Sequence, residues 1–230
     1  MQGHSTERYI LFTDLKLGST YIKRYFEYPN NNKLPMYERI LPSISVNPNT
    51  LELSFNENDF SFKNLNHKKF YTDVKNILEK KSNKDVIILL RNPKLKFISA
   101  FIQDYIKPHI SKLDDDNYIK EFIKSTIKEK FENTEYEFYS NHNGSRISDW
   151  LWWIPFLDDK KTKMYDIDKH DISDILVKHG EPYKNIKTST EHSKKLNKFM
   201  FDILLNMKEI NSIIDKNLIY EKIIYNYFKL

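Results

Sequence analysis

Short apolar runs and amphipathic stretches alternate along the chain, which predicts strands followed by helices. Apolar runs at Tyr9–Thr13 and Val86–Leu90 predict two buried strands. The second run has no polar interruption, as is typical of a strand covered on both faces in a parallel sheet. A helix is expected after each strand, at Ser19–Tyr28 and from Asn92–Pro93 onward, because Asn is a good helix cap and Pro suits the first turn.

The rest of the pattern predicts an α/β fold, a single domain with a central parallel sheet flanked by helices. Ligands of such sheets bind at the carboxyl ends of the strands. The segment 34–49 carries three Pro and is predicted to be irregular. The other predicted elements are helices at His67–Lys80, Asn117–Phe131, Ser148–Leu157, Ile172–His179 and Glu191–Phe228, the last broken near Glu209–Asn211, and strands at Leu51–Phe55 and Lys163–Ile167.

The length of 230 residues fits one domain over 9–230, with 1–8 as an N-terminal tail that is in part an expression remnant. Apolar residues make up 40% of the chain, enough for a sizeable core. The absence of Cys excludes disulfides, a cysteine nucleophile and thiolate metal sites. No apolar run approaches the ~18 residues of a membrane span, and there is no signal-peptide pattern. We therefore expect a soluble, cytoplasmic protein.

The net charge of +5 favours anionic ligands. Lys and Glu are interspersed rather than gathered into one basic block, so a small anionic cofactor is expected rather than a nucleic acid. This preference directs attention to the two places where a predicted strand runs into a predicted helix. Backbone N–H groups are unpaired at helix starts and the helix dipole is positive there, so both places favour anions.

The first of these turns has the residues of a phosphate-binding loop: Lys16, Gly18, Ser19, Thr20 and Tyr21. The glycine permits close backbone approach, and the two hydroxyls stand beside free N–H groups. The turn is not the GxxxxGK[ST] loop of nucleotide triphosphatases, because the lysine precedes the glycine and the loop is too short. The alternative interpretation is that Ser19 or Thr20 simply caps the helix.

The second turn places Arg91 at the end of its strand, with Ser99 ~9 Å along the following helix. An arginine side chain offers a bidentate fork that suits a terminal phosphate. The alternative interpretation is a structural ion pair.

Together the two turns resemble those of the sulfotransferases that use 3'-phosphoadenosine 5'-phosphosulfate (PAPS). In that family Pro-Lys-x-Gly-[Ser/Thr]-[Ser/Thr] binds the 5'-phosphosulfate, and Arg-[Asn/Asp]-Pro followed by an aromatic residue and Ser binds the 3'-phosphate. The separation of about 75 residues leaves room for one βαβ crossover. Leu15 stands where the family usually has Pro. The matching residues are Lys16, Gly18, Ser19 and Thr20 in the first turn, and Arg91, Asn92, Pro93, Phe97, Ser99 and Ala100 in the second.

The resemblance implies a P-loop NTPase-like sulfotransferase fold with PAPS as co-substrate and no metal. It makes Lys16 the group that neutralises the leaving bisphosphate, with Ser19 and Thr20 as donors to the 5'-phosphate. It gives Arg91 and Ser99 to the 3'-phosphate. A later segment, YKNIKTSTEHSKK, is similar to a loop that covers the cofactor in carbohydrate-type members, and this implies contacts from Lys187 and Thr188. A polar turn before a helix is the other interpretation of that segment.

Transfer to a hydroxyl acceptor also requires a general base within hydrogen-bond reach. By resemblance the candidates are Glu57, after the LELSF strand, and His142, although the Pro-Gln that often follows this histidine is absent. His67 is a third candidate. Trp150, Trp152 and Trp153 fit either a sugar platform or core packing.

Two other classes of protein stay open. One is a P-loop-like nucleotide kinase, which would bind ATP with magnesium. The other is a non-enzymatic module that binds a glycan or another polyanion through its basic surface. The acceptor and the oligomeric state are not predicted by these motifs.

Overall fold

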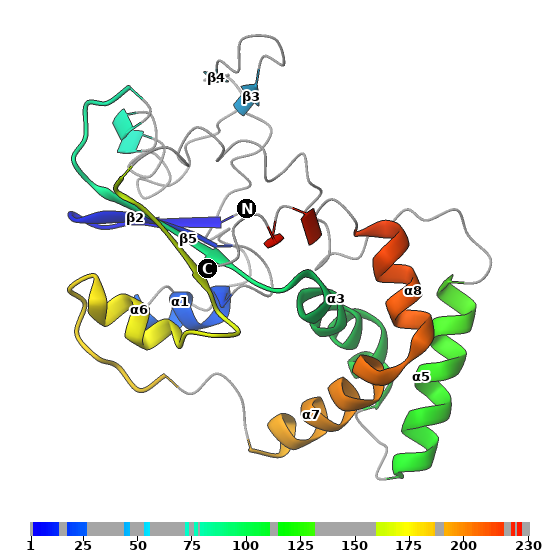
Figure 1. Cartoon of the computed structure of the whole chain (residues 1–230). Coiled ribbons are helices and arrows are strands. Elements are labelled where there is room, and N and C mark those ends of the chain that lie inside the picture. The colour runs from blue at the N-terminus through cyan, green and yellow to red at the C-terminus, as the bar shows by residue number, and fades with distance from the viewer. Residues whose placement is uncertain are drawn as a thin grey trace. The chain divides into compact units, whose positions relative to one another are not determined.

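The computed structural model gathers the chain into two compact units (Figure 1). The first comprises 1–90, 145–186 and the final residue, and the second comprises 91–144 and 187–229. A single domain over 9–230 was expected from the sequence. The structure describes residues 2–13, 18–26, 44–46, 53–55, 72–73, 76–77, 79–110, 115–131, 160–186, 191–218, 222–223 and 225–226.

The first unit is built on a four-stranded sheet with the order β1-β2-β5-β6. Its strands are β1 (Gln2–Ser5), β2 (Tyr9–Thr13), β5 (Asp85–Leu90) and β6 (Thr162–Asp166). The three predicted strands β2, β5 and β6 are parallel, and β1 pairs antiparallel with β2. The α/β class is therefore confirmed, but the sheet is mixed rather than wholly parallel. Residues 2–5, predicted to be part of an N-terminal tail, form the edge strand β1.

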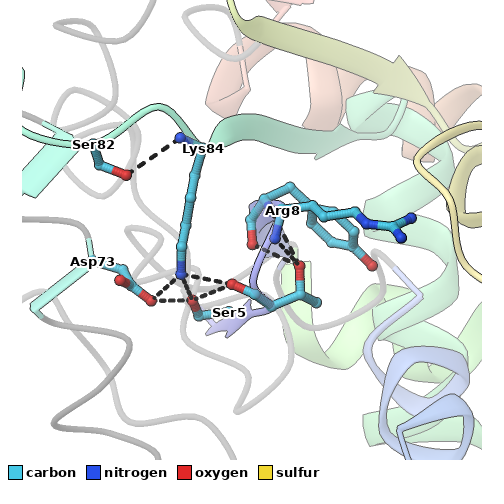
Figure 2. Close-up of polar contacts among 7 residues, drawn as sticks. Ser5, Arg8, Asp73, Ser82 and Lys84 are labelled. Atoms are coloured by element: carbon cyan, nitrogen blue, oxygen red, sulfur yellow. Dashed lines mark hydrogen bonds and ion pairs between the residues drawn. The ribbon is translucent and has the colours of Figure 1, made fainter.

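The edge strand β1 is held by a polar cluster of Ser5, Asp73 and Lys84 (Figure 2), which also includes the carbonyl of Thr6. The Nζ atom of Lys84 lies 2.7 Å from Asp73 Oδ2 and donates to the Thr6 carbonyl at 2.6 Å. Ser5 Oγ donates to the same Asp73 carboxylate. Both side chains of the ion pair are only 14% exposed, so the pair is well shielded from water. This cluster fixes the start of the chain against the residues that lead into β5.

Two helices cover one face of the sheet: α1 (Ser19–Tyr25) and α6 (Ile172–Lys178) (Figure 1). Alternate strand residues point to this face, as the pleat requires. Strand residues of the other face, such as Ile10 and Ile88, are also buried, so the prediction of strands buried on both faces is confirmed. The core under the two helices consists of Tyr9, Leu11, Ile22, Tyr25, Ile87, Leu89, Tyr165, Ile175 and Leu176.

A separate two-stranded antiparallel sheet joins β3 (Ile44–Val46) to β4 (Leu53–Phe55). Within the predicted strand Leu51–Phe55, residues 53–55 form β4. β3 corrects the expectation that 34–49 is wholly irregular. Its three residues are too few to produce a recognisable period along the sequence.

The described part of the second unit is helical, and its helices share one apolar core. Isoleucine and phenylalanine side chains from several of these helices pack there with Met200 and Leu204. The long helix predicted at 191–228 breaks at Met207, two residues before the predicted break. The π-helical turn η3 was not predicted. The helices are α3 (Pro93–Phe101), η3 (Ile102–Ile106), α4 (Lys107–Ile110), α5 (Asp116–Phe131), α7 (Glu191–Asn206) and α8 (Lys208–Asn217).

Two predicted helices are not fully covered by the described residues. Within His67–Lys80, residues 72–73 and 76–77 are helical. The predicted helix Ser148–Leu157 lies outside the described residues.

Candidate functional site

The two candidate turns follow neighbouring parallel strands of the first unit. β2 and β5 are in register from Tyr9 opposite Asp85 to Phe12 opposite Ile88. Since parallel strands end at the same edge of a sheet, the chain leaves β2 and β5 at one edge, where ligands of α/β sheets bind. This confirms the predicted placement of both strand ends.

In the first turn, Gly18 holds the cap position of α1 in a left-handed conformation, with φ 82° and ψ 10°. A Cβ atom at this position would lie 2.1 Å from Cδ1 of Ile172 on α6. Both the backbone conformation and the packing therefore require glycine here. Close approach to a ligand was the expected reason for Gly18, and its packing against Ile172 is a second reason inside the protein.

The start of α1 has no side-chain cap. The first hydrogen bond of the helix runs from the Ile22 N–H to the Gly18 carbonyl at 3.1 Å. The N–H groups of Ser19, Thr20 and Tyr21 precede it and so have no acceptor within the helix. The interpretation of Ser19 or Thr20 as a simple cap is wrong, because both lie inside the first turn.

The three side chains of this turn differ in their surroundings. Ser19 is buried and Thr20 is exposed. The Tyr21 hydroxyl donates to the Lys184 carbonyl at 3.0 Å, and burial raises the pKa of this tyrosine. The Tyr21 side chain is thus engaged with another part of the protein, and its backbone N–H is the group that belongs to the turn.

In the second turn, the start of the helix is capped by a residue of the turn itself. The Asn92 side chain accepts a hydrogen bond from the Lys94 N–H at 2.9 Å, and Pro93 is the first residue of α3. The predicted cap is confirmed. Arg91, half-buried, stands between the last residue of β5 and this cap.

Ser99 lies on α3 seven residues after Asn92, which is about two helical turns. The two residues therefore share one stripe of the helix, and helical side chains lean toward the helix N-terminus. Ser99 is half-buried, whereas Ile98 and Ala100 on either side of it are buried. The placement of Ser99 is compatible with a polar role on the side of α3 that leads back to Arg91.

A buried carboxylate that was not predicted lies at the same edge of the sheet. Asp166 ends β6 opposite Leu90 and is 4% exposed. Its Oδ1 accepts a hydrogen bond from the Asp168 N–H at 3.0 Å, so the side chain shapes the turn after the strand. An acidic residue directly after a short apolar run was the available signal.

Several predicted site residues lie outside the described residues. They are Lys16, Glu57, His142, Lys187 and Thr188, together with the third candidate base His67 and the three tryptophans Trp150, Trp152 and Trp153.

Among the described residues, no group of three or more His, Cys, Asp or Glu side chains is arranged to hold a metal ion. In the same part of the chain, no helix has the length and apolar character to cross a membrane.

No protein-family model, no curated protein and no solved structure matches this chain.

Proposed function

We propose that this protein is a PAPS-dependent sulfotransferase that acts on a hydroxyl of a glycan or a small molecule. The observation that carries the proposal is the placement of the two motifs. The residues Lys16, Gly18, Ser19 and Thr20 follow β2, and Arg91 follows β5, its parallel neighbour in the sheet. A nucleotide with phosphate groups at both its 5' and 3' positions suits two anion-binding motifs that follow adjacent parallel strands.

The first turn would hold the reacting end of PAPS. The N–H groups of Ser19 and Thr20 lie at the positive end of α1, where they favour the 5'-phosphate. As the acceptor oxygen bonds to sulfur, the bond from sulfur to the bridging oxygen breaks, and negative charge grows on the leaving 3',5'-adenosine bisphosphate. Lys16 is the residue we assign to that charge, since positioning and electrostatic stabilisation dominate such transfers. The acceptor proton passes to a base, for which Glu57 and His142 are the candidates.

The second turn would select the nucleotide. The Arg91 guanidinium has two parallel N–H donors that fit a phosphate monoester, and Ser99 adds a hydroxyl from the same helix stripe as the cap. Lys187 and Thr188 complete the proposed nucleotide contacts. The proposal assigns no role to a metal ion.

Isothermal titration with 3',5'-adenosine bisphosphate tests the binding half of the proposal. We expect micromolar affinity in the native protein and a loss of about tenfold or more in Lys16→Ala and in Arg91→Ala, since each removes a charged hydrogen-bonding group. Lys124→Ala is the matched control, because Lys124 is exposed on α5 and pairs with Glu121 at 2.7 Å. It should bind like the native protein.

Transfer of label from [35S]PAPS to a panel of glycans and phenols tests the chemical half. Lys16→Ala should abolish transfer. A parallel titration with ATP and magnesium discriminates the kinase alternative. Failure of the native protein to bind the bisphosphate, or tighter binding of magnesium ATP, would overturn the proposal.

A further inference from the structure

An extended segment, Glu181–Ile186, is fastened to the first unit by tyrosine hydroxyls, and we call it the strap. Tyr9 donates to Glu181 Oε1 at 3.0 Å, Tyr25 donates to the Pro182 carbonyl, and Tyr21 donates to the Lys184 carbonyl at 3.0 Å. The partners are separated by 157 to 172 positions along the chain. Three long-range tethers therefore fall within four consecutive residues of one segment.

Lys184 fastens the strap from the opposite direction. Its Nζ donates to the Tyr25 carbonyl at 2.9 Å and lies 4.9 Å from the centroid of the Tyr25 ring. Such a contact combines a charged hydrogen bond with a cation–π interaction. Just before the strap, Arg8 Nη1 donates to the Gly180 carbonyl at 3.0 Å. The strap has no regular secondary structure, so these side-chain contacts define its path.

The order of the contacts gives the strap a direction. Pro182 meets Tyr25 in the last turn of α1, and Lys184 meets Tyr21, one helical turn nearer the start of that helix. The strap thus runs antiparallel to α1, toward the turn that begins at Gly18.

The C-terminal end of the strap takes part in the apolar packing beside this turn. Ile186 packs in the same apolar cluster as Tyr21 and Ile172. Ile172 is the residue whose side chain closes against Gly18. Ile186 of the strap, Tyr21 of α1 and Ile172 at the start of α6 therefore pack against the same buried core cluster.

We infer that Tyr21 and Tyr25 are positioning residues that couple the strap to nucleotide binding at the Gly18 turn. This inference rests on the proposed function. A nucleotide bound at the start of α1 stabilises the turn, the turn stabilises Tyr21 and Ile172, and these hold the strap. Coupling between two sites is reciprocal. Loosening the strap therefore weakens nucleotide binding by the same factor by which bound nucleotide stabilises the strap.

The first test is the Tyr21→Phe/Tyr25→Phe double variant, which removes two hydroxyls and keeps both rings. We expect the Kd for 3',5'-adenosine bisphosphate and the KM for PAPS to rise about tenfold, the size expected for two hydrogen bonds of ordinary strength, while kcat stays within about twofold. Tyr183→Phe is the matched control. It makes the same change within the strap at a side chain that is 68% exposed, and it should leave both constants unchanged.

The second test is hydrogen exchange of the strap amides with and without the bisphosphate. Bisphosphate should slow exchange at 183–186 in the native protein and in Tyr183→Phe, and should have little effect there in the double variant. If the native protein fails to bind the bisphosphate, the proposed function and the coupling both fall. Binding by the native protein, with equal affinity and equal strap protection in the double variant, would overturn the coupling alone.

Discussion

The two helix starts that follow β2 and β5 occupy equivalent places in the chain but are built differently. α3 opens with Asn92, whose side chain accepts from the Lys94 N–H, and with Pro93, which has no N–H, so its own residues account for two of the first three helix positions. α1 opens with Gly18 in a left-handed conformation, without a side-chain cap, and with two hydroxyl residues in its first turn. The start of α3 is capped by a side chain. The start of α1 depends on packing from α6 and leaves the N–H groups of its first turn without a helical acceptor.

This difference matches the two roles that we propose for the turns. An uncapped start with several N–H groups suits a phosphate whose charge changes during transfer. A capped start with Arg91 immediately before it suits a fixed phosphate that identifies the nucleotide. The comparison predicts that mutations in the first turn affect stability through packing and affinity through the ligand, whereas the Asn92 cap affects stability alone.

The largest effect is expected at Gly18. Gly18→Ala should lower the free energy of unfolding by about 3 kcal/mol, because a left-handed residue with a Cβ costs roughly 1–2 kcal/mol and the new Cβ meets Ile172. Ile172→Val removes the Cδ1 atom that the Cβ would meet. A double-mutant cycle measured by urea unfolding should therefore show that Ile172→Val costs less in the Gly18→Ala background than in the native one. Additive effects would show that the contact is not what requires glycine.

A smaller effect should discriminate the two helix starts directly. Asn92→Ala removes the side-chain acceptor of the Lys94 N–H and should cost about 1 kcal/mol of stability. Thr20→Ala alters an exposed residue with no capping role and should change stability by less than about 0.5 kcal/mol. Affinity for the bisphosphate should show the reverse order, with a loss in Thr20→Ala and no change in Asn92→Ala. Equal affinity losses in the two variants would contradict the division of roles.

The smallest effect concerns pH and the helix that supports Gly18. His179, at the end of α6, is half-buried, and its Nε2 lies 3.0 Å from the Tyr165 hydroxyl. Burial lowers the pKa of His179 below its usual 6.5, although Asp85 at 3.9 Å from Nδ1 acts in the opposite direction. The folded state thus prefers neutral His179. The resulting stability is present above pH 6.5 and is lost as pH falls below it, with a slope of at most about 1.4 kcal/mol per pH unit.

Urea unfolding between pH 7.5 and 5.5 measures this loss. His179→Gln should flatten the acid side of the profile, and His170→Gln, which changes an exposed histidine nearby, should leave it as in the native protein. An unchanged acid slope in His179→Gln would contradict the assignment.

The elements that were predicted correctly are those encoded by residues close together in the chain. The apolar run of β5, the Asn92–Pro93 helix start and the spacing of α5 and α6 all depend on residues close together in the chain. β1 was missed because contacts from Asp73 and Lys84 hold Ser5 and Thr6, and its own four residues carry no strand pattern.

For the candidate site as well, the local motifs could be predicted and the long-range contacts could not. The two turns are contiguous motifs, so their residues could be named in advance. The packing of Ile172 against Gly18 and the tethers of the strap join residues more than 150 positions apart, and no local pattern reveals them. A general base is chosen by the folded geometry around the acceptor, so sequence alone left Glu57 and His142 as alternatives.

The central claim is that the turn after β2 and Arg91 after β5 hold different ends of one nucleotide. Titration of the native protein, Lys16→Ala and Arg91→Ala with 3',5'-adenosine bisphosphate and with 5'-AMP tests it most directly. The native protein should prefer the bisphosphate by about tenfold or more, Arg91→Ala should lose that preference while binding AMP normally, and Lys16→Ala should bind both ligands more weakly. An Arg91→Ala variant that weakens AMP and bisphosphate equally, or a native protein without preference, would contradict the claim.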